Sequence, residues 1–272
     1  MADFLSGLKI PIISSNIHTE NKKLAKQLLP YKVFNKYDLA VLAVTVDSTG
    51  LSHPGNGTTF EDPVEAAKRT VKAIKKKHRN IKRIVALTHI GFDKDIELAK
   101  ATTDISLIIG GHSHTLLGDV AGAKGKYPTI EKNLDGDEVF IVTSYRWGEY
   151  VGFIDVEYDS RGKIVSYEGA PIHLTNATAE DKKLKFQVTE WSTAFKEYSN
   201  TILGTTEYPL IQSTCQSIEC TLGDFSADSM EDYRAASVPN LAGAILNAGG
   251  IRSEIDAGKI SLQNALDCFP FG

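Results

Sequence analysis

Histidine side chains follow two apolar runs of the sequence. The run at 105–109 is followed by two glycines and then by His112 and His114, and the run at 83–87 is followed, after one threonine, by His89. Short apolar runs bounded in this way are typical of buried strands, and ligands of open α/β sheets lie at the carboxyl ends of strands. Because neutral imidazole binds zinc, iron, manganese and nickel, the spacing predicts a metal site.

Histidines also have ordinary structural roles, which weigh differently for the two runs. A single histidine after a strand is more often a capping or packing residue, so His89 alone is weak evidence for a metal. The Gly-Gly-His-Ser-His sequence at 110–114 is more specific, because two glycines let the backbone approach closely and packing does not require a histidine pair. Histidines two residues apart on an extended turn can point to different sides, so this loop could serve two ions.

The elements that would position these histidines alternate between strands and helices. A strand at 37–46 is followed by a helix from Pro63 to about Lys77, whose proline lies in its first turn. Next come the strand at 83–87, a short helix at 93–101 and the strand at 105–109. Because this is β-α-β order, we expect parallel pairing and an α/β fold, which becomes α+β overall with the later elements.

The rest of the chain contains strands, turns and helices in a less regular order. Beyond Leu117 the pattern predicts antiparallel hairpins, with a clear turn at 159–162. The other elements that we expect are a strand at 9–17, a helix at 178–199, the start of a second domain at 202, a buried helix from 222, a strand at 241–246 and a short helix at 261–266.

Three segments together resemble one known family. Thr88–Gly91 and Gly110–Thr115 are similar to the last two metal-ligand motifs of the metallophosphoesterases, and more narrowly of the 5'-nucleotidase family, which includes apyrases and cyclic-phosphodiesterase relatives. Asn247–Arg252 resembles the nucleotide-binding motif of that family's C-terminal domain. The resemblance extends from Ile13 to Phe271. It implies a partial metallophosphoesterase β-sandwich flanked by helices at 1–175, a linker helix at 176–200 and a partial C-terminal, substrate-binding domain at 201–272.

The resemblance also implies a site for two divalent metal ions, zinc or manganese. His89 and His112 would bind one ion, and His114 the other. The family's other ligands, and its catalytic His–Asp pair, belong to opening motifs that do not occur before Ile13, so no catalytic residue is assigned. Three ligands cannot complete two sites of four or more bonds each. We therefore expect a partial chain that binds metal poorly and is catalytically inert on its own.

Substrate binding in this family belongs to the C-terminal domain. By resemblance, Arg252 would contact phosphate, since a guanidinium group makes fork-like contacts to phosphoryl oxygens. Asn247 would contact the base or ribose, Gly249 and Gly250 would let the backbone pass close to the ligand, and Phe271 would be one of two aromatic residues around the nucleobase. Without the resemblance, an ordinary turn with a surface arginine explains this segment equally well.

The cysteines and two glycosylation sequons bear on the compartment. From the residues alone, three reduced and buried thiols are the simplest reading of Cys215, Cys220 and Cys268. The resemblance instead favours a Cys215–Cys220 disulfide with Cys268 free. The sequons at Asn56 and Asn176 agree with glycosylation on a secretory route. We expect a secreted or cell-surface protein whose signal peptide would lie upstream of Met1, because the first residues lack a basic start and an apolar stretch.

Composition narrows the partners of the chain. The net charge of −4 over 272 residues gives no support to nucleic-acid binding, and no apolar run approaches the roughly 18 residues of a transmembrane helix.

The resemblance implies a nucleotide substrate, and the reaction that we expect is metal-dependent hydrolysis of nucleoside 5'-phosphates to nucleoside and phosphate. The alternatives are a secreted nucleotide-binding relative without activity and another metallophosphoesterase, such as a cyclic phosphodiesterase or a sugar-diphosphate hydrolase. Gln216 stands where many family members carry an arginine, which leaves the substrate preference open.

Overall fold

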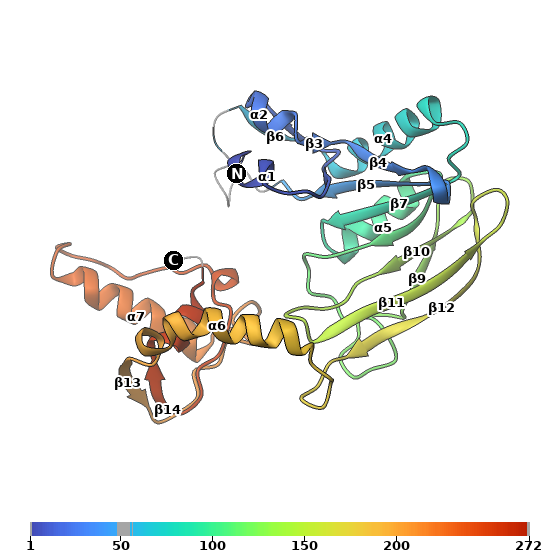
Figure 1. Cartoon of the computed structure of the whole chain (residues 1–272). Coiled ribbons are helices and arrows are strands. Elements are labelled where there is room, and N and C mark those ends of the chain that lie inside the picture. The colour runs from blue at the N-terminus through green and yellow to red at the C-terminus, as the bar shows by residue number, and fades with distance from the viewer. Residues whose placement is uncertain (1, 48–54, 56, 271–272) are drawn as a thin grey trace. The chain divides into compact units, whose positions relative to one another are not determined.

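The computed structural model describes residues 2–47, 55 and 57–270. Its internal contacts divide the chain into two units, Met1–Thr178 and Ala179–Gly272, which are described separately (Figure 1). The boundary falls just before the helix expected at 178–199, so that helix belongs to the second unit. Asn56 and Phe271 lie outside the described residues.

A six-stranded sheet forms the centre of the first unit. The strands β5, β7, β8 and β10 run parallel to one another, and the strands β4 and β9 at the two edges run antiparallel to their neighbours. This confirms the parallel β-α-β arrangement, and it shows that β10 continues the parallel sheet through β8. The order across the sheet is β4 (Tyr31–Phe34), β5 (Leu39–Thr45), β7 (Arg83–His89), β8 (Ile105–Ile109), β10 (Glu138–Val142) and β9 (Thr129–Lys132).

Two helices form one core with this sheet. Helix α4 (Pro63–Lys77) begins at Asp62, whose carboxylate accepts hydrogen bonds from the amides of the first turn. Helix α5 (Phe92–Ala101) follows β7 directly. Apolar side chains recur every three or four residues along α4 and face the sheet, as a half-buried helix requires. The largest fully buried side chains of this core are Leu42, Ile74, Ile81, Ile84, Leu98, Ile105, Ile108, Leu117 and Ile141.

A β-hairpin packs against the central sheet through a second apolar cluster. Strands β11 (Tyr150–Tyr158) and β12 (Ile164–His173) pair antiparallel, and the cluster unites Val85, Leu107, Phe140, Val142 and Ile164. The turn predicted at 159–162 is confirmed, with the Asp159 carboxylate accepting from the amides of Arg161 and Lys163.

Replacement of Gly162, the glycine of this turn, should destabilise the fold. Its φ of +85° lies in the left-handed region, and an added Cβ would collide with the carbonyl oxygen of Lys82. We expect Gly162→Ala to cost at least about 2 kcal/mol of unfolding free energy, since the left-handed backbone alone costs roughly 1–2 kcal/mol. Gly136 is the matched control, because its φ is +80° and an added Cβ would meet open space. Denaturant unfolding measures both alanine variants. Equal losses of unfolding free energy in Gly162→Ala and Gly136→Ala would contradict this explanation.

The strand expected at 9–17 is interrupted. Two short strands replace it, β1 (Ile12–Ile13) and β2 (Ile17–Thr19), which pair with β3 (Leu28–Leu29) and β6 (Thr58–Phe60). The fully buried Asn16 lies between them. Its side-chain amide donates to the carbonyl of Thr45 at 2.7 Å and its Oδ1 accepts from the Thr45 amide at 3.0 Å. A side chain thus makes the hydrogen bonds that a continuous strand would make.

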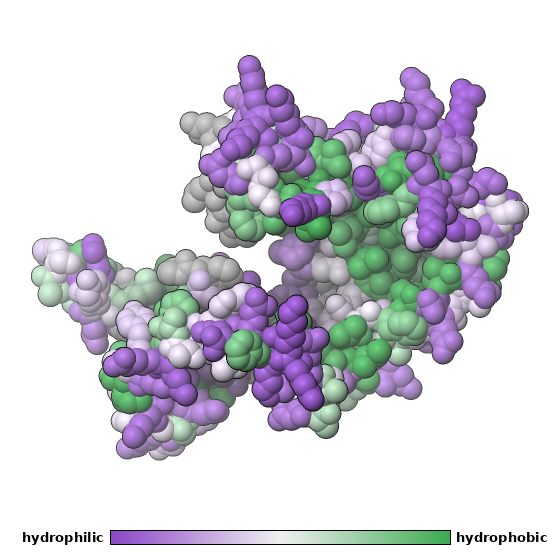
Figure 2. Space-filling view, in the orientation of Figure 1, coloured by the Kyte–Doolittle hydropathy of each residue, from purple (hydrophilic) through white to green (hydrophobic). Residues whose placement is uncertain are grey.

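Hydrophobic residues also lie at the surface of the first unit (Figure 2). Leu87 and Ile109 are opposite each other on two inner strands of the sheet, yet they are 49% and 42% exposed. Val151 and Phe153 of β11 are exposed to a similar extent. Apolar side chains on inner strands are ordinarily covered, so this face is only partly covered by the hairpin. The first unit also contains the short helices α1 (Ala2–Ser6), α2 (Lys22–Ala25) and η1 (Asn35–Tyr37).

The second unit packs its segments around a small core. Its buried members are Leu210, Leu222, Ile251, Ile255 and Cys268. The helix predicted at 261–266 is confirmed, and Ser261 and Asn264 form a capping box at its start. The elements in chain order are α6 (Lys182–Ser199), β13 (Ile202–Thr206), α7 (Thr221–Ala235), η2 (Ala248–Gly250), β14 (Gly258–Ser261) and α8 (Leu262–Cys268), and β13 pairs with β14.

Two expectations for the second unit were wrong. The segment 241–246 has no strand pairing, because none of the described strands pairs with it, and Ile245 is 96% exposed. Helix α7 buries only Leu222 and Ser226, so it is a largely exposed helix. The apolar side chains of α6, including Trp191, are likewise exposed. None of the helices in the described part of the chain is long and apolar enough to span a membrane.

Candidate functional site

His89 and His112 come together at the carboxyl ends of two neighbouring parallel strands. His89 is the last residue of β7, and His112 follows β8 after two glycines. Their ring centroids are 5.0 Å apart, and the amide of Gly91 donates to the carbonyl of Gly111 at 3.1 Å, which joins the two loops. Burial is the larger cause that lowers the pKa of His89, and the neighbouring His112 is the smaller one. The neutral imidazole, which is the form that binds metal, is thereby favoured.

His114 faces a different neighbour. Its ring centroid lies 5.0 Å from that of Trp147, edge to face. Both residues have positive φ angles, as do His112 and Tyr145. Residues other than glycine rarely adopt this conformation, and it concentrates at functional sites. The loops after β8 and β10 therefore meet at the contact of His114 with Trp147.

The glycines of the Gly-Gly-His-Ser-His sequence have a packing role. A Cβ on Gly110 would collide with the Asp95 carboxylate, and a Cβ on Gly111 would lie 3.2 Å from Nδ1 of His89. The glycine pair therefore lets the β8 loop lie directly on Asp95 and His89. This is the close backbone approach that the sequence indicated, but the protein itself occupies the space.

The histidine pair does not by itself make a metal centre. Within the described residues, no group of three or more histidine, cysteine, aspartate or glutamate side chains could hold a metal ion. Three carboxylates near the motifs, which do not match the family's ligand positions, are engaged elsewhere. These pairs are Asp93 with Lys124 at 2.7 Å, Asp104 with Lys75 at 2.8 Å and Asp95 with the Thr88 hydroxyl at 2.5 Å.

Sequence reasoning missed the roles of Asp95 and Trp147. Asp95 is fully buried, and this burial raises its pKa to about 7, opposed by the hydrogen bond from Thr88. In the sequence it is one of two acidic residues in the first turn of a helix, the usual position of a solvated acid. Its place on the apolar face of the helix, three residues before the buried Leu98, was the available signal.

The segment 247–252 of the second unit forms a tight turn on a fixed base. The Asn247 side chain accepts from the amide of Gly249 at 3.1 Å and caps the short helix η2. The Arg252 amide donates to the carbonyl of Cys268 at 2.8 Å, and the buried Ile251 anchors the turn. A Cβ at Gly250 would meet nothing within 4 Å, so the protein's own packing does not require glycine there.

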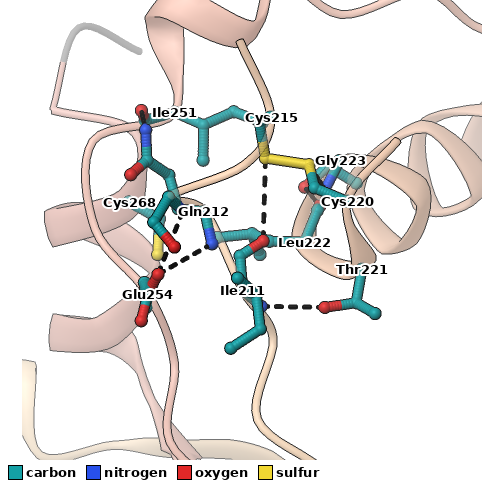
Figure 3. The surroundings of a disulfide bond; sticks show 12 residues. Ile211, Gln212, Cys215, Cys220, Thr221, Leu222, Gly223, Ile251, Glu254 and Cys268 are labelled. Carbon is teal, nitrogen blue, oxygen red and sulfur yellow. Dashed lines mark hydrogen bonds between the residues drawn. A yellow bond between two sulfur atoms is a disulfide. The ribbon is translucent and has the colours of Figure 1, made fainter. Parts of the chain in front are cut away.

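A disulfide lies beside this turn in the same unit. Cys215 and Cys220 are bonded, as the resemblance implied, and Cys268 is free and buried (Figure 3). Burial, with a smaller contribution from Asp267, raises the pKa of Cys268 to about 11, so its thiol stays protonated near neutral pH. Cys220 also caps α7, since its Sγ accepts from the amide of Gly223 at 3.3 Å.

Removal of this disulfide should destabilise the second unit moderately. The sequence separation is only 5, and closure of so short a loop is worth about 2 kcal/mol. We expect Cys215→Ala/Cys220→Ala to lower the unfolding free energy by about this amount, and Cys268→Ala to leave the bond intact. Mass spectrometry of unreduced peptides checks the pairing. Free thiols at 215 and 220 would contradict it.

Comparison with known proteins finds similarity to 5'-nucleotidases and apyrases. The 5'-nucleotidase C-terminal domain matches residues 202–272. Human 5'-nucleotidase is 34% identical over 290 residues, which cover 98% of this chain and 50% of that protein. An apyrase of Anopheles gambiae is 31% identical over 286 residues, which cover 98% of this chain and 49% of that protein.

The fold agrees with the sequence comparison. The crystal structure of a 5'-nucleotidase precursor from Thermus thermophilus superposes with a TM-score of 0.89 at 28% identity, covering 100% of this chain and 55% of that one. This confirms the mixed α/β fold that the sequence predicted. The chain spans about half the length of the curated relatives that it matches. The chain is thus similar to 5'-nucleotidases over nearly its whole length and shares their fold, and residues 202–272 match the C-terminal domain of that family.

Proposed function

We propose that this chain acts in the hydrolysis of nucleoside 5'-phosphates to nucleoside and phosphate. The observation that carries the proposal is the similarity to human 5'-nucleotidase, which is 34% identical over a match that covers 98% of the chain. The histidine pair at the sheet edge and the turn at 247–252 add support, since phosphate-ester hydrolysis needs groups that hold metal ions and groups that hold the nucleotide.

His89, His112 and His114 are the metal ligands that we assign to this chain. In the two-metal chemistry of such hydrolases, divalent cations polarise the phosphoryl group and activate water. Zinc and manganese both accept imidazole ligands, and the lowered pKa of His89 keeps its ring neutral. Because the described residues contain no group of three such donors, we assign no catalytic step to these histidines alone.

The second unit is assigned to nucleotide binding. Arg252 would hold the phosphate through charge-assisted hydrogen bonds, while Asn247 is exposed and offers an amide to the base or ribose. Gly249 and Gly250 would let a ligand lie against the backbone, because neither glycine is required by neighbouring atoms. Phe271, outside the described residues, keeps its assignment from the resemblance alone.

A second candidate function is nucleotide binding without hydrolysis. The donor count among the described residues favours it, since two adjacent imidazoles are fewer ligands than a catalytic zinc site takes from protein. Release of phosphate from AMP by residues 1–272, with zinc, manganese or cobalt added, tests whether these residues hydrolyse AMP by themselves. We expect no release above that of a His112→Ala variant. Metal-dependent release that the variant lacks would make this chain a hydrolase by itself.

The secreted or cell-surface location is proposed on separate grounds. Disulfides persist mainly in oxidising compartments, and the Cys215–Cys220 bond is formed. Asn176 of the second sequon is exposed in a turn, where a glycan would be tolerated. A glycan on Asn176 in protein expressed through a secretory pathway would support the proposal.

A further inference from the structure

Asp95 is an acidic residue that is fully buried beside the two histidine loops. It lies in α5, one turn after the helix begins, and its side chain has no exposed surface. One carboxyl oxygen accepts the hydroxyl hydrogen of Thr88 at 2.5 Å. The other, Oδ2, has no hydrogen-bond partner in the described part of the chain. A buried polar group with an unsatisfied atom costs stability, so its presence calls for a compensating role.

The position of Asp95 relates it to both histidine loops. Its bonded partner, Thr88, directly precedes His89 at the end of β7. Its unpartnered Oδ2 lies under Gly110, the first residue after β8, so closely that a side chain on Gly110 would collide with it. Asp95 thus lies against the carboxyl ends of both strands that present the histidine pair, at Thr88 and Gly110.

Further hydrogen bonds connect the start of α5 with the loop of His112. The amide of Phe92, at the start of α5, donates to Oγ of Ser113 at 3.0 Å, and that hydroxyl shares a hydrogen bond with Thr115 at 2.7 Å. The start of α5 is therefore bonded to the loop of His112, while Asp95 is bonded to Thr88 and lies against Gly110. The bond from Thr88 to Asp95 is buried, and the two bonds of Ser113 are part-buried. Hydrogen bonds shielded from water in this way hold side chains in place.

We infer that Asp95 is a positioning residue for the histidine pair, which sets the separation of the His89 and His112 rings through the Thr88 hydroxyl and the Gly110 backbone. The inference concerns the geometry of the pair and holds whether or not the chain hydrolyses nucleotides. If the proposed function is correct, Asp95 also determines how well the pair can receive a metal.

The test compares the imidazole ring signals of His89 and His112 by NMR at one fixed alkaline pH. Asp95→Leu removes the acceptor, and Thr88→Val removes the donor of the same hydrogen bond. Asp95→Asn keeps a carbonyl acceptor for Thr88. Thr102→Val is the control, because it removes another buried hydroxyl bond of α5, from Thr102 to the Leu98 carbonyl at 2.7 Å, at the far end of the helix.

We expect Asp95→Leu and Thr88→Val to shift both ring signals by several linewidths, the double variant to add little, and Asp95→Asn to restore signals close to the wild-type positions. Thr102→Val should lower the melting temperature with the rings unmoved. Unchanged ring signals in both Asp95→Leu and Thr88→Val, or an Asp95→Asn variant as shifted as Asp95→Leu, would overturn the inference. Since no nucleotide or metal is added, failure here leaves the proposed function untouched.

Discussion

Replacement of Arg252 by alanine should weaken the binding of AMP by roughly ten- to a hundredfold. A hydrogen bond between a guanidinium group and a phosphate is charge-assisted and contributes about 1.5–3 kcal/mol. The backbone of the turn should survive the change, because its anchors are the buried Ile251 and the main-chain bond from Arg252 to Cys268. The loss should therefore appear in the dissociation constant.

Two variants make this measurement specific. Arg234→Ala removes an exposed arginine from α7 of the same unit, and it should leave AMP binding unchanged if general charge is not responsible. Arg252→Lys should recover only part of the affinity, since an ammonium group lacks the planar fork of a guanidinium. Calorimetric titration of each variant with AMP gives the constants. Wild-type affinity in Arg252→Ala would reduce Arg252 to a surface residue.

Asp95→Asn should flatten the dependence of stability on pH. Burial raises the pKa of Asp95 from 3.8 to about 7 in the folded protein, so the folded state holds this proton over a range in which the unfolded chain has lost it. The unfolding free energy therefore falls as the pH rises from about 4 to about 7 and is constant above that range. The shift corresponds to about 4 kcal/mol at most.

The comparison with a variant isolates this contribution from other carboxylates. In Asp95→Asn, the side chain is neutral at every pH, so the variant should be more stable than the wild type above pH 7, by a margin that shrinks toward pH 4. Asp93→Asn changes an exposed carboxylate two residues away, and it should keep the wild-type profile. Denaturant unfolding at several pH values measures both. A pH profile in Asp95→Asn identical to that of the wild type would show that this carboxyl group titrates normally.

Periodic apolar patterns predicted most of the first unit. The runs that became β5, β7 and β8 are apolar and separated by helices, so buried parallel strands were the simplest reading, and it was correct except at the exposed Leu87 and Ile109. The segment at 9–17 was misread because the side chain of Asn16 replaces backbone pairing, which no periodicity reports. The segment at 241–246 was misread because an apolar run forms a strand only where a partner strand is available.

For the candidate site, the sequence indicated residue types better than contacts. The closeness of His89 and His112 followed from parallel strands ending at one edge. The contact of His114 with Trp147 did not, because the left-handed backbone of both residues depends on loops that pattern reasoning leaves undefined. Asp95 was missed for a related reason, since the direction of a side chain at the start of a helix depends on what packs against that turn.

The most direct test of the central claim, that the turn at 247–252 binds a nucleotide, is residue-resolved amide NMR of the chain during titration with AMP. We predict saturable shifts at Asn247–Arg252 that adenosine, which has no phosphate, produces only at much higher concentration. The amide of Gly204 of β13 in the same unit should stay in place and serve as the internal reference. Absence of any saturable shift in 247–252, with AMP-dependent shifts elsewhere or nowhere, would contradict the account.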